Sequence, residues 1–478
     1  TTSIYTPSLH DALPISGWEF NAEARFRSAM ALAGRVLAGS EWGSSACRGL
    51  VVTSQRHGMV LSDRSGRELL ACPNVDNRAS PQAARIAERY GPTIYDRTGR
   101  WPDSFFPALR LVWLREEEPG LFAEVDRILM INEWFVWRLT GIARSEPTNA
   151  AETLLLDLPS LEWSDDLRRL FGLEGIRPVE RIESGATVGG LSREAASLIG
   201  LAEGLPVHMA HSDTQAAVLG TGAVEGEAVV VNGSTTPVVR ILAGYPWDRE
   251  RRVWASPFSG DVWLVEANAN VSGLAYRRLV SDFAGFLASS LRDLGLPADE
   301  ARITRMAEER AAREGGGTGF WGPRISDVKT GKRLESILVT EGTVNPFEAI
   351  LPSFLENLAF AVHQNILLTD AVAGSTADRV YLTGGGSRNE YFVSLLKALL
   401  PERTLLRTRS LETTSLGAVL SAMRASDGAE AANEAGNLLR TGVVSVSTGL
   451  PEPGVRRKLD EWLRFYSELA YPYSGRNR

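Results

Sequence analysis

The sequence predicts an α/β protein of two domains with a mixed sheet in each. Short β-branched apolar runs alternate with longer amphipathic runs in both halves of the chain, which is typical of strands alternating with helices. A length of 478 residues exceeds what one ordinary core accommodates, so two domains are expected. A small-residue helix gives way to a hairpin near residue 225, so we place the domains at residues 17–225 and 226–478.

The first domain begins with a helix followed by strands. Residues 21–39 have the apolar spacing of a helix, and residues 47–55 have the composition of a strand. Residues 59–69 contain a Ser-Gly turn and are predicted to return beside that strand. Residues 104–141 are rich in Trp and Leu and predict helices, the second of them over residues 123–141.

The second domain repeats this alternation. Residues 229–242 have β-branched residues on both sides of a glycine turn and predict a hairpin. Residues 299–314 predict a charged helix, and residues 346–373 a long amphipathic one. Residues 378–400 combine a strand, three glycines and a helix, and residues 458–473 predict a closing helix.

Composition narrows the class of function. A hydrophobic content of 44% and a charged content of 23% are those of a globular protein. The formal net charge of -7 disfavours nucleic acid and anionic membrane surfaces as partners. Two cysteines are too few for a disulfide framework or a zinc site, and no apolar run is long enough to span a bilayer. We expect a cytoplasmic enzyme that acts on small molecules.

Asp213 is the first candidate functional residue. It follows a short buried strand and opens a small-residue helix within residues 205–224. The ordinary interpretation is a helix N-cap. The functional interpretation is a general base at the mouth between the two domains, where a carboxylate takes a proton from an alcohol. The two roles are compatible because a capped carboxylate is also held in place.

Two glycine turns form a second set of candidates. In the hairpin, Gly233 is followed by three hydroxyl side chains, more donors than a plain turn requires. Residues 383–389, TGGGSRN, connect a strand to a helix, and such a turn lets the backbone approach a flat or anionic ligand. A tight strand-to-helix turn is the ordinary alternative. Asn389 is placed either to cap that helix or to hydrogen-bond a nucleoside.

Two polar loops form the third set. Residues 54–58, SQRHG, and residues 74–78, NVDNR, gather several hydrogen-bonding side chains at neighbouring positions. Such groups suit the hydroxyls of a sugar or polyol, and the ordinary alternative is a pair of solvated loops. The candidates are Gln55, Arg56, His57, Asp76 and Arg78.

The order of these motifs resembles that of the FGGY carbohydrate kinases. The resemblance extends from residue 17 to residue 422 and is carried by SQRHG, NVDNR, HSDTQAAVLGTGAV, NGSTTPVV and LTGGGSRNEYF. It implies the two-domain actin-like (ribonuclease H-like) ATPase fold, with a substrate domain followed by a nucleotide domain. It also implies phosphoryl transfer from ATP, assisted by Mg²⁺, to a small sugar or polyol. A homodimer is left open.

The resemblance assigns a role to each candidate residue. Asp213 would be the catalytic base and, through water, a tentative contact of the metal. The loops at 54–58 and 74–78 would bind the acceptor. The nucleotide would be bound by Gly233, Ser234 and Thr235 as a phosphate clasp, by Gly273 near the ribose and phosphates, and by Gly384, Gly385 and Asn389 at the adenosine.

The acceptor remains open. The run ACPNVDNRAS, with Asn74 in place of the family's Trp, is most similar to autoinducer-2 kinases, which phosphorylate a dihydroxy-pentanedione. His57 is more like xylulokinases, so a pentulose or polyol is the alternative. A non-catalytic sugar-binding relative is a second class of hypothesis. A filament or chaperone ATPase is a third, which the polar loops disfavour.

The start of the chain departs from the family pattern. Residues 1–16 have no period of 2 or 3.6 and are expected to be an unstructured or foreign segment. The family's first phosphate hairpin, Asp-x-Gly-Thr-Thr, is absent. We therefore expect the first strands of domain I to be missing, and the activity of this chain is an open question.

Overall fold

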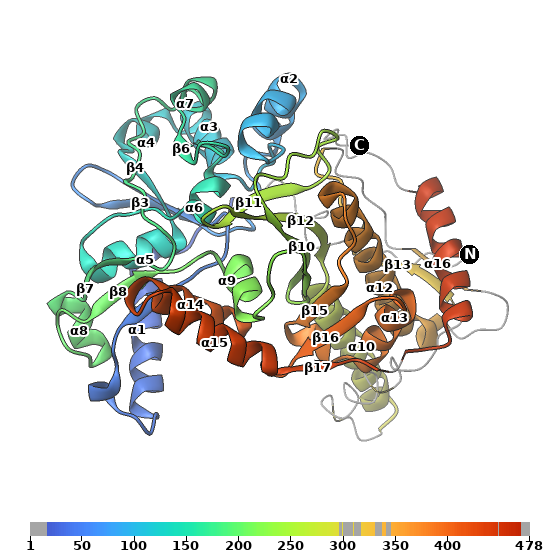
Figure 1. The fold of residues 1–478 in the computed structure, drawn as a ribbon. Coiled ribbons are helices and arrows are strands. Elements are labelled where there is room, and N and C mark those ends of the chain that lie inside the picture. Colours follow the sequence, from blue (N-terminus) through green and yellow to red (C-terminus); the bar gives the residue numbers. More distant parts are fainter. Residues whose placement is uncertain are drawn as a thin grey trace.

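The computed structural model describes most of the chain as two lobes (Figure 1). The segment predicted to be unstructured or foreign, residues 1–16, lies outside the described residues, as does most of the helix predicted over residues 299–314. The described residues are 17–295, 299, 309, 317–329, 337–340, 346–447 and 449–469. Within them, no helix combines the length and apolar character needed to cross a membrane.

The first lobe contains two three-stranded sheets and a short hairpin. One sheet has the order β1-β8-β7, with β1 parallel and β7 antiparallel to β8, and is therefore mixed. The other has the order β3-β2-β4 and is antiparallel. The bounds are β1 Leu50–Val52, β2 Met59–Ser62, β3 Glu68–Cys72, β4 Arg127–Met130, β5 Leu156–Asp157, β6 Glu162–Trp163, β7 Thr187–Gly190 and β8 Pro206–Met209.

Helices surround these sheets. The predicted helix at residues 21–39 is confirmed as α1, and the helix opening at Asp213 as α9. The helical segments of this lobe are α1 Ala22–Ala38, η1 Ser44–Ala46, α2 Ser80–Thr98, α3 Pro107–Glu117, α4 Pro119–Glu124, α5 Ile131–Thr140, α6 Pro147–Ala150, η2 Ala151–Thr153, α7 Asp165–Phe171, α8 Arg193–Ile199 and α9 Asp213–Gly220.

Two expectations for this lobe are wrong. The segment beginning at Met59 does not return beside β1, because β2 pairs with β3 and β4 in a different sheet. Both faces of β2 are buried: Met59 and Leu61 belong to one apolar core and Val60 to another. The helix predicted over residues 123–141 begins only at Ile131, because the preceding residues form β4 and pair with β2. Tertiary pairing here overrides the local helical pattern.

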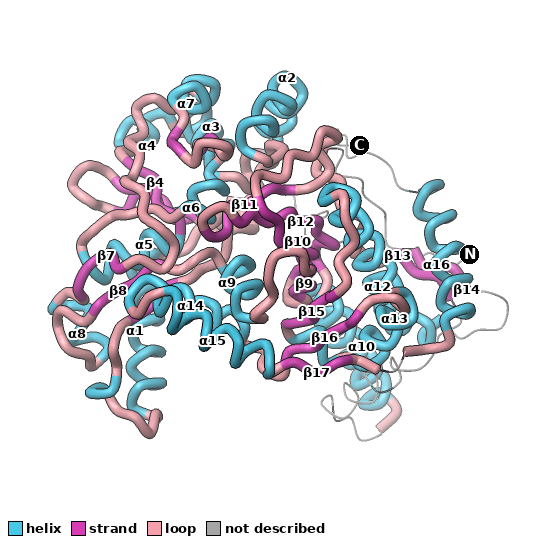
Figure 2. The backbone as a smooth tube through the Cα atoms, in the orientation of Figure 1, coloured by secondary structure: helices cyan, strands magenta, loops and turns pink. Residues whose placement is uncertain are grey.

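The second lobe is built on a seven-stranded mixed sheet, drawn in magenta across Figure 2. Its order is β11-β12-β10-β9-β15-β16-β17, and β15 lies parallel to both β9 and β16 while the other pairs are antiparallel. The bounds are β9 Ala228–Val231, β10 Thr235–Ala243, β11 Trp254–Ser259, β12 Val262–Val271, β15 Arg379–Thr383, β16 Thr404–Thr408 and β17 Val443–Ser445. A separate two-stranded antiparallel sheet pairs β13 Gly317–Phe320 with β14 Ile337–Thr340.

Helices cover both faces of this sheet. Alternate residues of β9 and β15, such as Val230 and Val380, contact the core formed with α12, α13 and α16, while Val229 and Tyr381 contact the core that contains Val218 of α9. The hairpin, the long helix and the strand-glycine-helix unit predicted for this half are confirmed. The helical segments are α10 Gly273–Asp293, α12 Pro346–Ala373, η3 Gly385–Arg388, α13 Glu390–Leu399, α14 Thr413–Ser426, α15 Ala429–Thr441 and α16 Glu452–Leu469.

Helices α9 and α14 lie side by side between the two lobes (Figure 1). Their backbones approach closely at glycines. A Cβ on Gly417 would lie 1.8 Å from the carbonyl oxygen of Ala216, and one on Gly220 would lie 1.9 Å from that of Thr413. Only glycine fits at these contacts, so the sequence fixes α9 directly against a helix from the other half of the chain.

We therefore expect Gly417→Ala to destabilise the protein by about 1–3 kcal/mol, because the added methyl group forces the two helices apart. Gly436→Ala is the matched control, since it is also a helical glycine but has open space around the added Cβ. Higher helix propensity should make that variant about 0.5–1 kcal/mol more stable. Thermal and urea unfolding measure both changes, and equal effects of the two substitutions would contradict the packing argument.

Candidate active site

Asp213 is the first residue of α9 and follows β8 after three intervening residues. The expectation that it is the N-cap is wrong by one residue, because Ser212 occupies the cap position. The Oδ1 of Asp213 accepts a hydrogen bond from the backbone N–H of Thr214 at 2.7 Å. Its carboxylate is thus held at the positive end of the helix, where ionised oxygens are favoured.

Contacts from both lobes fix the backbone of Asp213. Its N–H donates to the carbonyl of Ser54 at 2.9 Å, in the polar loop that follows β1. The hydroxyl of Thr414, in α14, donates to its carbonyl oxygen at 3.5 Å. Burial raises the pKa of the Asp213 carboxyl; the charge of Arg56 opposes this and that of Glu266 adds to it. A raised pKa makes a carboxylate a better proton acceptor.

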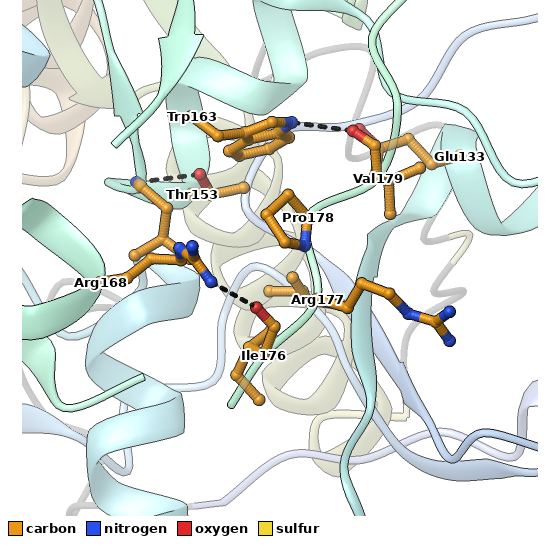
Figure 3. Close-up of a pocket in the computed structure, with 10 residues that line it drawn as sticks. Glu133, Thr153, Trp163, Arg168, Ile176, Arg177, Pro178 and Val179 are labelled. Atoms are coloured by element: carbon orange, nitrogen blue, oxygen red, sulfur yellow. Dashed lines mark hydrogen bonds between the residues drawn. The ribbon is translucent and has the colours of Figure 1, made fainter. Parts of the chain in front are cut away.

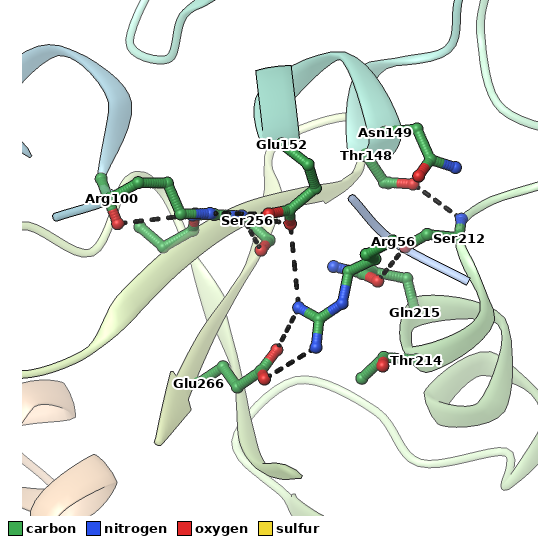
Figure 4. A network of polar contacts seen from close by, with 12 residues as sticks. Arg56, Arg100, Thr148, Asn149, Glu152, Ser212, Thr214, Gln215, Ser256 and Glu266 are labelled. Carbon is green, nitrogen blue, oxygen red and sulfur yellow. Dashed lines mark hydrogen bonds and ion pairs between the residues drawn. The ribbon is translucent and has the colours of Figure 1, made fainter. Parts of the chain in front are cut away.

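Arg56 connects the first polar loop to the sheet of the second lobe. Its Nη1 and Nη2 donate to the two carboxylate oxygens of Glu266, on β12, at 2.7 and 2.9 Å. Its Nη1 also lies 3.7 Å from Glu152. Figure 4 shows the guanidinium of Arg56 between these two carboxylates. The side chain predicted to bind the acceptor is therefore already part of a buried ion-pair network.

His57 belongs to the same network. Its Nε2 lies 2.9 Å from Glu152, and burial lowers the pKa of its imidazole. Burial opposes ionisation of Glu152, but Arg100, His57 and Arg56 together outweigh it and hold the pKa of Glu152 well below its usual range. The neutral imidazole therefore donates its Nε2–H to a carboxylate. Gln55, the residue before Arg56, is half-buried.

Asp76 and Arg78 form a neighbouring buried cluster. The Nε of Arg78 donates to Asp76 at 3.0 Å, and its Nη1 donates to Glu19 at 3.0 Å. Arg110 lies 3.7 Å from Asp76 and donates to the backbone carbonyl of His57 at 2.8 Å. Arg110 thus contacts both polar loops, which agrees with the prediction that the two loops are neighbours.

The glycine elements of the second lobe meet at one turn. A Cβ on Gly273 would lie 2.1 Å from the carbonyl oxygen of Gly233, and the N–H of Ser272 donates to the carbonyl of Ser234 at 3.1 Å. Gly384 has a φ of 85° and packs against the backbone of Asn232, where a Cβ would lie 2.6 Å from its carbonyl oxygen. The hairpin turn and the glycine triplet, about 150 residues apart in the sequence, are therefore neighbours.

The other predicted nucleotide residues lie on the edges of this region. Thr235 begins β10, directly after the turn, and is exposed. Gly385 is exposed, with open space around its Cα. Asn389 is the N-cap of α13, and its Oδ1 accepts from the N–H of Phe392 at 3.0 Å. Of the two roles predicted for Asn389, the structure shows that of the helix N-cap.

A chain of contacts joins Asp213 to the hairpin turn. Thr414 contacts Asp213, as described above, and the hydroxyl of the preceding Thr413 lies 2.9 Å from that of Thr383. The carbonyl of Thr383 in turn accepts from the N–H of Asn232 at 2.8 Å. The three predicted spots, at residues 213, 233 and 384–386, therefore lie together at the junction of the lobes.

Two small cavities are lined by other residues of the described chain. One is in the first lobe, where Trp163, Arg168 and Pro178 form part of its wall (Figure 3). Two donors of this wall, Trp163 Nε1 and Arg168 Nη1, bond to the backbone carbonyls of Val179 and Ile176. The other cavity lies at the junction of the lobes and is lined by Glu183, Ser184, His211, Leu219, Phe258, Ser259, Ser421 and Arg424.

The sequence analysis missed several residues of this region, namely Arg100, Arg110, Glu152, Asn232, Glu266 and Thr414. Two of them carried a signal. Glu266 is a carboxylate in the middle of the apolar strand VWLVEANANV, and Glu152 lies among small and apolar residues in NAAETLLL. Both side chains are fully or almost fully buried, and a buried carboxylate requires a partner. The arginines that serve as partners come from distant parts of the sequence.

Sequence comparison with family models and curated proteins identifies relatives of the chain. The N-terminal domain of the FGGY family of carbohydrate kinases matches residues 9–220, and its C-terminal domain matches residues 234–426. A putative sugar kinase, YoaC of Bacillus subtilis, is 28% identical over 84% of this chain and 80% of its own length. An autoinducer-2 kinase of Enterobacter sp. is 28% identical over 84% of this chain and 77% of its own length.

Solved structures share the fold. A ligand-bound xylulose kinase from Lactobacillus acidophilus superposes with a TM-score of 0.79 at 14% identity, covering 97% of this chain and 92% of that one. A Plasmodium falciparum glycerol kinase with ADP gives a TM-score of 0.75 at 17% identity, covering 98% and 92%. These matches confirm the two-domain fold with mixed sheets.

Both domain models match in the expected order, and together they span most of the sequence. The chain therefore belongs to the FGGY family of carbohydrate kinases, which phosphorylate carbohydrates with ATP.

Proposed function

We propose that this chain transfers the γ-phosphoryl group of ATP to a primary hydroxyl of a small, uncharged sugar-like acceptor, with Asp213 as the general base. The observation that carries the proposal is the position of Asp213. Its backbone is bound by the acceptor loop on one side and by α14 on the other, and α14 contacts the strand that leads to the glycine turn. A base in this position lies between an acceptor and a nucleotide.

The chemistry follows from this placement. The carboxylate of Asp213 accepts the proton of the acceptor hydroxyl while the hydroxyl oxygen forms a bond to the γ-phosphorus. The bond from that phosphorus to the β,γ-bridging oxygen breaks, and ADP leaves. Backbone N–H groups and hydroxyls around Gly233, Ser234 and Thr235 would bind the phosphates, and Gly273 lets α10 begin against that turn.

A magnesium ion fits this arrangement. Mg²⁺ in phosphoryl-transfer sites is bound by one or two carboxylates and the substrate phosphates, so an all-protein cluster of ligands is not required. Within the described residues there is no group of three or more metal-binding side chains. Asp213, through water, would hold the ion, which when bound neutralises phosphate charge.

The charges near Asp213 favour an uncharged acceptor. Three arginines of the acceptor side have a carboxylate partner within 3.0 Å: Arg56 has Glu266, Arg78 has Asp76 and Arg100 has Glu152. A fourth, Arg110, lies 3.7 Å from Asp76. A sugar acid would need a cation that these carboxylates do not already neutralise. Autoinducer-2 kinases phosphorylate a dihydroxy-pentanedione, which is uncharged. Several relatives of this chain are named autoinducer-2 kinase.

A pentulose is the alternative acceptor, supported by the xylulose kinases among the solved structures and by His57 in the first loop. A coupled assay of ADP release with dihydroxy-pentanedione, D-xylulose, glycerol and gluconate separates these cases. We expect turnover with the pentanedione first, D-xylulose second, and none with gluconate. Preference for gluconate would contradict the charge argument, and no ADP release with any acceptor would indicate a non-catalytic sugar-binding protein.

Asp213→Asn should reduce kcat by about 10²–10⁴-fold, because the amide has no basic oxygen for the hydroxyl proton. Asp165→Asn is the matched control: Asp165 is also the first residue of a helix after a serine cap, but it lies on the surface of α7. That variant should keep full activity. Steady-state kinetics together with circular dichroism test both, and a folded Asp213→Asn protein with undiminished kcat would exclude Asp213 as the base.

Gly273→Ala should weaken ADP binding by about 5–150-fold, since its methyl group would collide with the carbonyl of Gly233 and displace the turn. Gly285→Ala lies in the same helix, α10, with open space around the added Cβ, and should bind ADP normally. Isothermal titration calorimetry measures the two dissociation constants. Equal ADP affinity in both variants would argue against the turn at Gly233 as the phosphate site.

A further inference from the structure

Glu266 occupies an unusual position for a carboxylate. It lies in the middle of β12, between Val265 and Ala267, and its side chain is 2% exposed. Besides the two hydrogen bonds from Arg56, its Oε1 accepts one from the Nδ2 of Asn268 at 3.0 Å. A carboxylate buried at this depth is retained only when its partners compensate for the lost hydration.

The partner, Arg56, comes from the other lobe. It follows β1 in the first lobe, two residues after the Ser54 carbonyl that binds the backbone of Asp213. Both terminal nitrogens of its guanidinium are oriented toward β12 by the paired geometry, which Arg forms with carboxylates more rigidly than Lys does. The position of the acceptor loop is thereby tied to the central sheet of the nucleotide lobe.

Glu266 is the partner of Arg56 that belongs to the second lobe. The other carboxylate near Arg56, Glu152 from η2, belongs to the first lobe and also binds Arg100. The contact from α14 to Asp213 is the hydroxyl of Thr414. Removing the charge of Glu266 would therefore remove the ion pair that holds Arg56 to β12.

We propose that Glu266 is a positioning residue for phosphoryl transfer. By holding the guanidinium of Arg56 across the junction of the lobes, it fixes the acceptor loop beside Asp213. This inference rests on the proposed function, in which Asp213 accepts the proton of the acceptor. It assigns Glu266 a role through Arg56 and Asp213, without contact to the reacting atoms.

Glu266→Gln tests the inference because the side chain keeps its shape and loses its charge. The acceptor KM should rise about tenfold with little change in the KM for ATP, since the acceptor loop alone loses its attachment. The kcat should change less than the acceptor KM, because Glu266 does not contact the reacting atoms. Glu266→Asp restores the charge that pairs with Arg56, so its acceptor KM should return toward that of the unchanged protein.

Glu227→Gln is the matched control. Glu227 is another buried carboxylate of the second lobe and pairs with Arg379 and Arg440, away from the acceptor loop. Its substitution should lower the midpoint of thermal unfolding without changing the acceptor KM. If Glu266→Gln behaves like this control, Glu266 is only a structural ion-pair partner and the inference is wrong.

The ion pair between Arg56 and Glu266 can also be tested by a measurement that does not depend on enzymatic turnover. Arg56→Met, Glu266→Gln and the double variant form a cycle on the free energy of unfolding, and the two substitutions should be non-additive. Additive effects would contradict the ion pair. A full-length chain without turnover on any acceptor would overturn the proposed function and the role of Glu266 with it. Turnover with an unchanged acceptor KM in Glu266→Gln would overturn the present inference alone.

Discussion

The contact between α9 and α14 determines where the site lies. Gly220 and Gly417 have no side chains, so the two helix backbones approach at distances that any Cβ would prevent. Helix α9 begins at Asp213 and belongs to the first half of the chain, whereas α14 belongs to the second. Because these helices cannot separate without losing this packing, the carboxylate stays beside the strand that ends at Thr383 and the turn at Asn232.

The region around Asp213 is charged but internally compensated. Arg56, Arg100 and Arg110 are almost fully buried, and each has a carboxylate within 4.0 Å: Glu266 of the second lobe for Arg56, Glu152 for Arg100 and Asp76 for Arg110. Removing these charges from water costs free energy, so the network contributes more to the orientation of its side chains than to the stability of the fold. In a kinase that must exclude water as a competing acceptor, rigid charges can orient hydroxyls without a large rearrangement. The electrostatics and the fold thus support the same interpretation of the site.

Local pattern was sufficient for β9, β10, α12, β15 and α13 of the second lobe, but in the first lobe it gave the wrong pairing for β2 and missed β4. Residues 127–130 have a helical pattern with their neighbours, and only their pairing with residues 59–62 makes them a strand. Similarly, Ser212 rather than Asp213 caps α9, a difference of one residue that the sequence does not resolve. These errors arise where contact with a segment distant in the sequence decides the local conformation. A local sequence pattern carries no information about such a contact.

The sequence by itself determined the class of the protein, the order of its motifs and the candidates Asp213, Gly233 and Gly384, because each depends on local chemistry: a carboxylate at a helix start and glycines at turns. Only the tertiary structure decided which groups face them. The pairing of Arg56 with Glu266, and of His57 and Arg100 with Glu152, joins segments up to about two hundred residues apart. Burial makes those pairings obligatory, and burial is a property of the folded chain.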